Sequence, residues 1–206
     1  MTREKSIIYT ARFFSALFNP FYLPVVGLIL LFTLGDMSLL PTSYKLQVLI
    51  VVYLFTALMP TGFIALYRRY NGWSLLQLSH RHRRMVPYII SMLCYLGCTW
   101  ILYINRALYF CITIVMVSLV VQIVCTFINV WWKISTHAAA IGGVTGALIF
   151  FSAYYHFNPT WWLCLVLIVA GILGTSRIIL RQHSLSQVLG GYGIGFICAL
   201  IGFICL

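Results

Sequence analysis

Long apolar runs separated by short polar breaks are the feature that most constrains this chain. A transmembrane α-helix needs about 20 consecutive apolar residues, and runs near that length recur along most of the sequence. Of the 206 residues, 63% are hydrophobic and 7% are charged, which would leave a water-soluble fold with too much exposed apolar surface. No period-two alternation indicates a membrane barrel. The sequence therefore predicts an all-α, polytopic membrane helix bundle.

The apolar runs predict six or seven transmembrane helices in a single integral-membrane domain over residues 1–206. The expected spans are Phe21–Leu34, Leu46–Leu66, Val86–Tyr103, Ala107–Trp131, His137–Tyr155, Trp161–Leu180 and Ser184–Leu206. The first span is short for a bilayer. It either extends back through Ile7–Phe18 or follows an amphipathic surface helix within residues 1–18.

Acidic side chains are almost absent, and this restricts the chemistry. Glu4 and Asp36 are the two carboxylates of the chain. Magnesium and calcium sites need carboxylate oxygens, and glycosidase-type acid and base catalysis needs a carboxylate pair. The cysteines lie in apolar spans, where they act as small hydrophobic residues. We therefore predict no metal and no cofactor, and chemistry based on His, Ser, Arg, Lys or Tyr.

Three breaks between spans hold most of the remaining polar residues. They are residues 68–87, residues 131–137 and residues 176–184. Two predicted spans separate each break from the next, so all three are expected on the same face of the membrane. The sequence therefore predicts that these three clusters can meet in one site.

The cations are distributed unevenly between the two faces. Eleven of the 13 Lys and Arg residues lie at the N-terminus or in the three clusters, and Lys45 and Arg106 are the other two. The positive-inside rule places the richer face in the cytoplasm, and by itself it requires no catalysis. Removing Arg81, Arg84, Lys133 and Arg177 as site residues still leaves seven against two. We therefore expect the site to face the cytoplasm.

Two of the clusters place a histidine where the next helix begins. His137 follows Ser135-Thr136, and His183 precedes Ser184. A helix N-terminus offers free N–H groups and the positive end of the helix dipole, which favour anions. Arginine adds a planar fork that can donate two hydrogen bonds to one phosphate. This combination indicates a phosphate site rather than lipid-headgroup anchoring alone.

Small residues in the predicted spans His137–Tyr155 and Ser184–Leu206 have a separate interpretation. Glycines at this spacing allow two membrane helices to approach each other closely. The glycines concerned are Gly142, Gly143, Gly146, Gly191 and Gly195.

The clusters resemble the motifs of the type 2 phosphatidic acid phosphatase superfamily, which includes membrane lipid phosphatases, soluble acid phosphatases and haloperoxidases. Ser176-Arg177-x5-His183 reproduces its third motif. Ser135-Thr136-His137 is similar to the second motif, Pro-Ser-Gly-His, with two substitutions. Arg81-x-x-Arg84-x-x-Pro87 resembles the signature of a divergent prokaryotic branch, which implies a location in a prokaryotic inner membrane. The resemblance covers roughly residues 77–195.

The resemblance implies a role for each matching residue. His183 corresponds to the nucleophile that forms a phosphohistidine, and His137 to the acid that protonates the leaving alkoxide. The implied phosphate-binding residues are Arg177, Arg84, Arg81, Ser135 and Lys133. The family has an Asp four residues after the nucleophile, where this chain has Gln187. We hypothesise that the Gln187 carbonyl accepts the imidazole N–H and takes over the orienting role.

The predicted function is a metal-independent phosphatase acting on a membrane lipid phosphate. Polyprenyl phosphate or pyrophosphate, phosphatidic acid and a phosphatidylglycerophosphate-like lipid are the substrate classes considered. Two alternatives stay open: binding or transport of an anionic lipid or phosphate without hydrolysis, and a lipid phosphotransferase. The expected partners are the lipid substrate and the bilayer, with no nucleic acid, and a homo-oligomer is left open.

Overall fold

The computed structural model describes residues 3–33, 35–72 and 85–205. Within these ranges the chain is helical and has no strand. Seven described segments are long and apolar enough to cross a membrane: Glu4–Leu31, Thr42–Tyr70, Met85–Ile104, Tyr109–Ile128, Thr136–Tyr154, Thr160–Ile179 and Leu185–Cys205. The predicted all-α polytopic bundle is confirmed, with the higher of the two expected numbers of spans.

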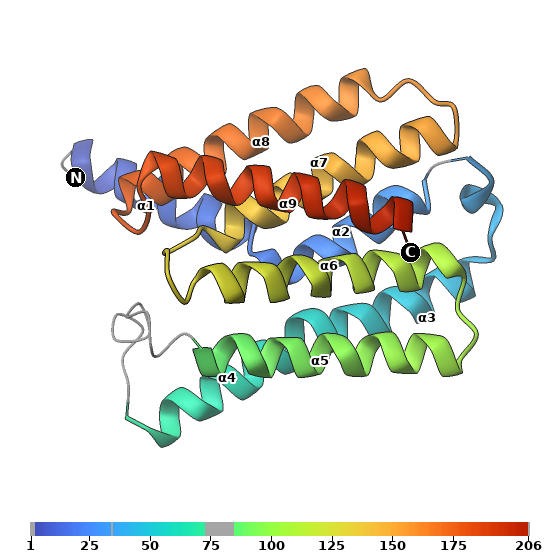
Figure 1. Cartoon of the computed structure of the whole chain (residues 1–206), viewed down its shortest axis with the longest axis horizontal. Coiled ribbons are helices and arrows are strands. Elements are labelled where there is room, and N and C mark those ends of the chain that lie inside the picture. Colours follow the sequence, from blue (N-terminus) through green and yellow to red (C-terminus); the bar gives the residue numbers. More distant parts are fainter. Residues whose placement is uncertain (1–2, 34, 73–84, 206) are drawn as a thin grey trace. The chain divides into compact units, whose positions relative to one another are not determined.

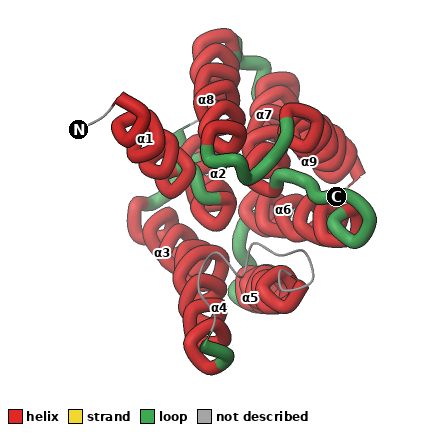
Figure 2. The backbone as a smooth tube through the Cα atoms, turned by 90° about the vertical axis from the view of Figure 1, so that its left-hand side faces the viewer, coloured by secondary structure: helices red, strands yellow, loops and turns green. Residues whose placement is uncertain are grey.

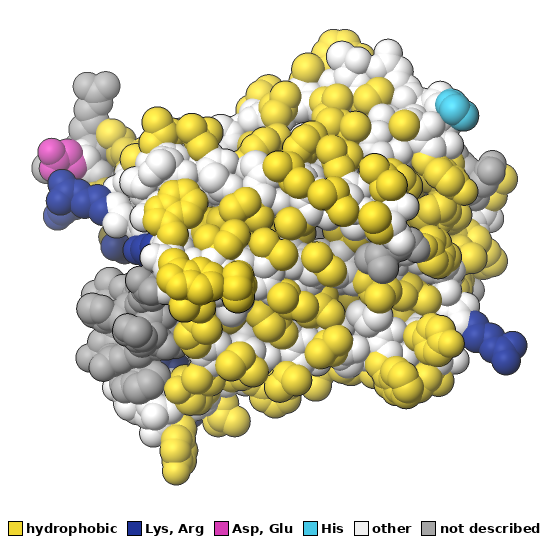
Figure 3. Space-filling view, viewed as in Figure 1, with side chains coloured by type: hydrophobic (Ala, Val, Ile, Leu, Met, Phe, Trp, Pro, Cys, Tyr) yellow, Lys and Arg dark blue, Asp and Glu magenta, His cyan; other side chains and the backbone are white. Residues whose placement is uncertain are grey.

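The chain divides into two compact units, which we describe separately. One unit combines Met1–Leu23 with Trp132–Leu206, and the other is Pro24–Trp131. Apolar side chains dominate the visible surface of both units (Figure 3). Such a surface is suited to contact with lipid and not with water.

The Pro24–Trp131 unit contains the helices α2 (Leu23–Leu31), α3 (Thr42–Tyr53), α4 (Met59–Tyr70), α5 (Met85–Ile104) and α6 (Tyr109–Ile128). α5 packs along α6 (Figure 1). A π-helical turn, Leu54–Leu58, joins α3 to α4 just before Pro60. The regular hydrogen-bond pattern of a helix is interrupted here because a proline has no backbone N–H to donate.

The second span is longer than the predicted Leu46–Leu66, because the helical segment runs over Thr42–Tyr70. The added residues at its start include Lys45, whose Nζ donates a hydrogen bond to the carbonyl oxygen of Ser38, 2.6 Å away. Long basic side chains can keep their charge away from the apolar part of a helix in this way. Polar residues at the ends of the run therefore did not end the helix.

The other unit contains α1 (Arg3–Leu17), α7 (Thr136–Tyr154), α8 (Thr160–Ile179) and α9 (Leu185–Cys205). Figures 1 and 2 show α7 beside both α8 and α9, and α1 beside α8. Buried Ile141, Leu148, Val166 and Leu173 form an apolar core between α7 and α8. α1 corresponds to most of the helix predicted within residues 1–18. Together with α2 it forms the first candidate membrane span, Glu4–Leu31.

Glycines bring the backbones of α7 and α9 into close contact. A Cβ added at Gly191 would lie 2.6 Å from the carbonyl oxygen of Ser135, and one at Gly195 would overlap the carbonyl of Ala139. The four glycines that face the partner backbone in this way are Gly142, Gly146, Gly191 and Gly195. The predicted close approach is confirmed at these four. Gly143 makes only an ordinary contact, with its nearest neighbour 3.8 Å from the added Cβ.

Candidate phosphate site

The first candidate group lies at the start of α7. Ser135 is the N-cap residue, and its Oγ accepts a hydrogen bond from the backbone N–H of Ala138, 3.4 Å away. Its side chain is fully buried, whereas Lys133 and His137 are half-buried. His137 belongs to the first turn of a 19-residue helix. The positive end of the helix dipole therefore adds to the charge of nearby cations.

Arg177 lies in the last turn of α8 and is only 8% exposed. Its Nη1 donates a hydrogen bond to Oγ of Ser15 on α1, 2.7 Å away, and Ser15 is buried as well. A buried cation needs hydrogen-bond acceptors to offset its lost hydration. Ser15 supplies one, so α1 helps to determine where the guanidinium lies.

The chain turns sharply between α8 and α9. Arg181 has a left-handed φ of 52°. The N–H of Gln182 donates to the Arg177 carbonyl (3.1 Å), and that of Arg181 donates to the Ile178 carbonyl (2.9 Å). This is the Schellman arrangement that ends many helices. The N–H of His183 also donates to the Arg177 carbonyl, 3.4 Å away, so the turn keeps the motif's arginine and histidine backbones together.

A capping box opens α9. The N–H of Ser184 donates to Oε1 of Gln187 (3.2 Å), and the N–H of Gln187 donates back to Oγ of Ser184 (3.4 Å). This reciprocal pair satisfies N–H groups that the helix itself leaves unpaired. Gln187 therefore has a structural role that requires no catalysis.

The same Gln187 oxygen also determines which nitrogen of His183 carries the proton. The N–H of Ser184 can only donate, so the amide atom facing it must be the oxygen. Nδ1 of His183 lies 3.2 Å from that oxygen and must therefore donate to it as N–H. In a neutral imidazole the lone pair then lies on Nε2. The hypothesised contact between Gln187 and His183 is present.

A backbone hydrogen bond joins the α7 and α9 groups. The N–H of Ser135 donates to the carbonyl of Gln187, 3.3 Å away. Two of the three predicted clusters, residues 131–137 and 176–184, are thus brought together within one unit. Arg81 and Arg84, from the third cluster, lie outside the described residues. In the described part of the chain, no group of three or more His, Cys, Asp or Glu side chains is placed to bind a metal.

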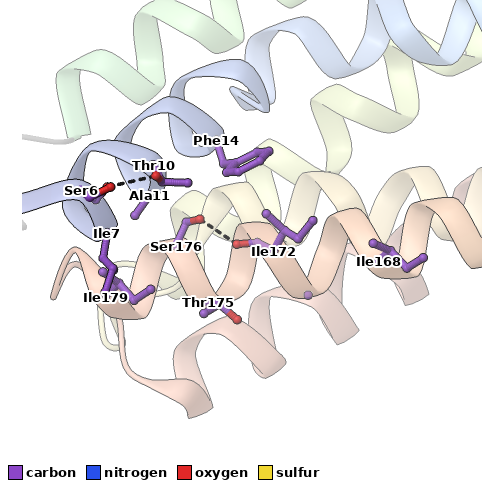
Figure 4. Close-up of a pocket in the computed structure, with 11 residues that line it drawn as sticks. Ser6, Ile7, Thr10, Ala11, Phe14, Ile168, Ile172, Thr175, Ser176 and Ile179 are labelled. Atoms are coloured by element: carbon purple, nitrogen blue, oxygen red, sulfur yellow. Dashed lines mark hydrogen bonds between the residues drawn. The ribbon is translucent and has the colours of Figure 1, made fainter. Parts of the chain in front are cut away.

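A groove of about 550 Å³ runs between α1 and α8 (Figure 4). Its apolar lining consists of Ile7, Ala11 and Phe14 from α1 and Ile168, Ile172 and Ile179 from α8. Figure 4 shows Ile7 and Ile179 at one end of the groove and Ile168 at the other. The groove therefore lies between the same two helices that the bond from Arg177 to Ser15 connects.

Ser15 is the site residue that sequence reasoning missed. It lies 162 residues before Arg177 and outside every motif that suggested a phosphate site. Its neighbours in the sequence are apolar residues of the first helix, so no local pattern distinguishes it from a helix serine that has no role in a site.

These features define the class of protein: a polytopic helical membrane protein with two histidines and a buried arginine at adjoining helix ends. Residues 122–206 match the model of the PAP2 superfamily, a segment that contains α7, α8 and α9. The match confirms the resemblance to the type 2 phosphatidic acid phosphatase superfamily over this segment of the chain. Neither the comparison with curated proteins nor that with solved structures gives a match. This similarity supports a phosphatase-type hydrolase function.

Proposed function

We propose that the protein is a metal-independent phosphatase that removes phosphate from a membrane lipid through a phosphohistidine on His183. The observation that carries the proposal is the contact of His183 Nδ1 with Gln187 Oε1 at 3.2 Å. It leaves Nε2 as the nucleophilic atom, and the backbone N–H of the same histidine bonds to the Arg177 carbonyl, 3.4 Å away. Independence from metal rests on the sequence, because two carboxylates in 206 residues offer little to hold a cation.

In the first step, Nε2 of His183 donates its lone pair to phosphorus, and the bond from phosphorus to the lipid oxygen breaks. Protonated His137 gives its proton to the leaving alkoxide, which departs as a neutral alcohol. Arg177 would hold the phosphoryl oxygens as their charge develops, with Lys133 and Ser135 as further donors. Arg81 and Arg84 join this group on the family resemblance alone.

In the second step, water attacks phosphorus and the bond from phosphorus to nitrogen breaks. His137, now neutral, takes a proton from the water. Inorganic phosphate leaves, and His183 regains its lone pair on Nε2. Throughout both steps, Gln187 would keep the proton of His183 on Nδ1, so that the same nitrogen is presented in each cycle.

The lipid character of the substrate is proposed from the surroundings of the site. All four helices of this unit belong to segments apolar enough to cross a membrane. The site residues lie where α7 and α9 begin and where α8 ends, which is where a membrane helix meets the headgroup region. A phosphate carried on a lipid would reach that level without leaving the bilayer.

The direct test is phosphate release by purified protein in EDTA. The substrates are phosphatidic acid, a polyprenyl diphosphate and phosphatidylglycerophosphate. We expect turnover of at least one lipid, and a loss of about 10³-fold or more in His183→Ala, because the nucleophile is removed. His156→Asn is the matched control, since His156 is exposed in the turn just beyond the far end of α7 and asparagine tolerates its left-handed φ of 51°.

The outcomes separate the proposal from its alternatives. Unchanged turnover in His183→Ala would overturn the phosphohistidine mechanism. Saturable lipid binding without phosphate release would favour the non-hydrolytic alternative. Appearance of the phosphoryl group on a second lipid alcohol, in place of free phosphate, would indicate a phosphotransferase.

We also propose that the site faces the cytoplasm, on the excess of cations at that face. The test places one cysteine at Gln182, in the turn between α8 and α9, in a variant whose seven cysteines are replaced. An impermeant thiol reagent should leave intact cells unlabelled and label opened cells. Ready labelling of intact cells would reverse the orientation.

A further inference from the structure

We propose that the groove between α1 and α8 holds the hydrocarbon chain of the lipid phosphate whose headgroup Arg177 binds. This inference rests on the proposed function and extends it from the reacting phosphate to the rest of the substrate. It also gives α1, which lies outside the matched segment, a part in substrate recognition.

The first argument is the chemistry of the groove wall. Four hydroxyl residues line the groove besides the isoleucines: Ser6, Thr10, Thr175 and Ser176. Two of these hydroxyls are already bonded within their own helices. Thr10 Oγ1 donates to the Ser6 carbonyl (3.0 Å), and Ser176 Oγ donates to the Ile172 carbonyl (2.7 Å), as Figure 4 shows. What these residues offer a ligand is mainly carbon, which suits a hydrocarbon chain and not a polar molecule.

The second argument is continuity with the phosphate site. Ser176 lines the groove, and the next residue, Arg177, turns into the interface of the same two helices to reach Ser15. On α1, Ala11 lines the groove and Ser15 follows one helical turn later. A ligand that places an anion at Arg177 therefore has an apolar channel directly alongside, which matches a phosphate joined to a long chain.

The third argument is the space at Gly171. This residue lines the groove, and a Cβ added there would meet no heavy atom within 4 Å. The remaining contacts of α1 with α8 do not fill this position. A larger side chain at Gly171 can therefore enter the groove without disturbing the helix pair, and it should improve helix propensity.

The experiment compares Gly171→Leu with the matched control Gly193→Leu. Gly193, on α9, also has nothing within 4 Å of an added Cβ, and it does not line the groove. Dipalmitoyl and dihexanoyl phosphatidic acid share one headgroup and differ in chain length. In Gly171→Leu we expect KM for the dipalmitoyl substrate to rise about tenfold, because leucine displaces roughly two methylene groups of the chain. The dihexanoyl substrate and the Gly193→Leu variant should change by less than about twofold.

If Gly171→Leu raised KM equally for the dipalmitoyl and the dihexanoyl substrate, or for neither, the groove assignment would be overturned. Photocrosslinking separates this failure from failure of the proposed function. A long-chain alkyl phosphate with a photoactivatable group in its chain should label residues 6–14 or 168–179, and Gly171→Leu should reduce that labelling. If the protein hydrolyses none of the lipids but shows this labelling, the groove assignment stands and the proposed phosphatase function is refuted. Labelling confined to other helices would refute the groove.

Discussion

The helix pairs α7–α9 and α1–α8 belong to the same unit and are built in opposite ways. α7 and α9 touch backbone to backbone through four glycines, and the Ser135 N–H bonds directly to the Gln187 carbonyl. α1 and α8 leave a groove of about 550 Å³ between them and share the buried bond from Arg177 to Ser15.

The difference separates two tasks. Residues proposed to react with phosphate need fixed mutual positions, and close backbone packing leaves little freedom to relax. A surface that accepts lipid chains gains from open space and flexible apolar side chains. The predictions below test whether the two pairs respond to substitution as differently as their packing implies.

The largest effect is expected from adding a methyl group between the closely packed helices α7 and α9. In Gly195→Ala the added methyl would overlap the Ala139 carbonyl, which belongs to the backbone and cannot rotate away. We expect the free energy of unfolding in detergent to fall by about 3 kcal/mol. Gly193→Ala on the same helix has open space and should unfold almost as the wild type does. Equal stability of the two variants would contradict the close packing of α7 and α9.

A smaller effect is expected at Gln187 on α9, which contacts His183. Gln187→Ala removes the acceptor for Nδ1 and half of the capping box, so kcat should fall about 30-fold and stability by about 1 kcal/mol. Gln187→Glu keeps an acceptor and adds the negative charge that the family's Asp would carry. Its turnover should equal or exceed that of the wild type. If Gln187→Ala lost stability alone, the residue would be only a helix cap.

The smallest effect is expected at the hydrogen bond from Arg177 to Ser15, which joins α8 to α1. Ser15→Ala removes the acceptor for Arg177 Nη1, so kcat/KM should fall about fivefold to tenfold, in line with one lost charged hydrogen bond. Ser15→Thr restores the hydroxyl and should recover most of the activity. Tyr9→Phe, on the same helix, is the control, because it removes an exposed hydroxyl that does not line the groove.

The inhibition constant for vanadate distinguishes positioning from packing in this comparison. If Ser15 positions Arg177, Ser15→Ala should weaken vanadate inhibition by a similar factor. A variant that loses stability but keeps the vanadate constant would show that Ser15 only packs α1 against α8.

The apolar runs were enough to predict the helices, because each transmembrane helix satisfies its own backbone and its length follows from the bilayer. The ends of the helices were harder to predict. The helix around Leu46–Leu66 continues through Lys45 at one end and Arg68 at the other, because long basic side chains can direct their charge away from the apolar run.

Within the site, local patterns could be predicted and long-range contacts could not. Four residues separate His183, just before α9, from Gln187 in the first turn of α9, so their contact could be expected from the sequence. The partnership of Ser15 with Arg177 depends on how α1 packs against α8, and neither residue's neighbours carry that information. The groove likewise depends on the packing of two helices whose isoleucines resemble those of any membrane span.

One oxygen atom, Oε1 of Gln187, accepts both the first N–H of the α9 capping box and the Nδ1 proton of His183. Fraying of the first turn of α9 and loss of imidazole orientation are therefore a single event. In a chain in which that turn has not formed, Gln187 would not hold the Nδ1 proton of His183, so the orientation proposed for attack on phosphate would be reached only as α9 completes its N-terminus.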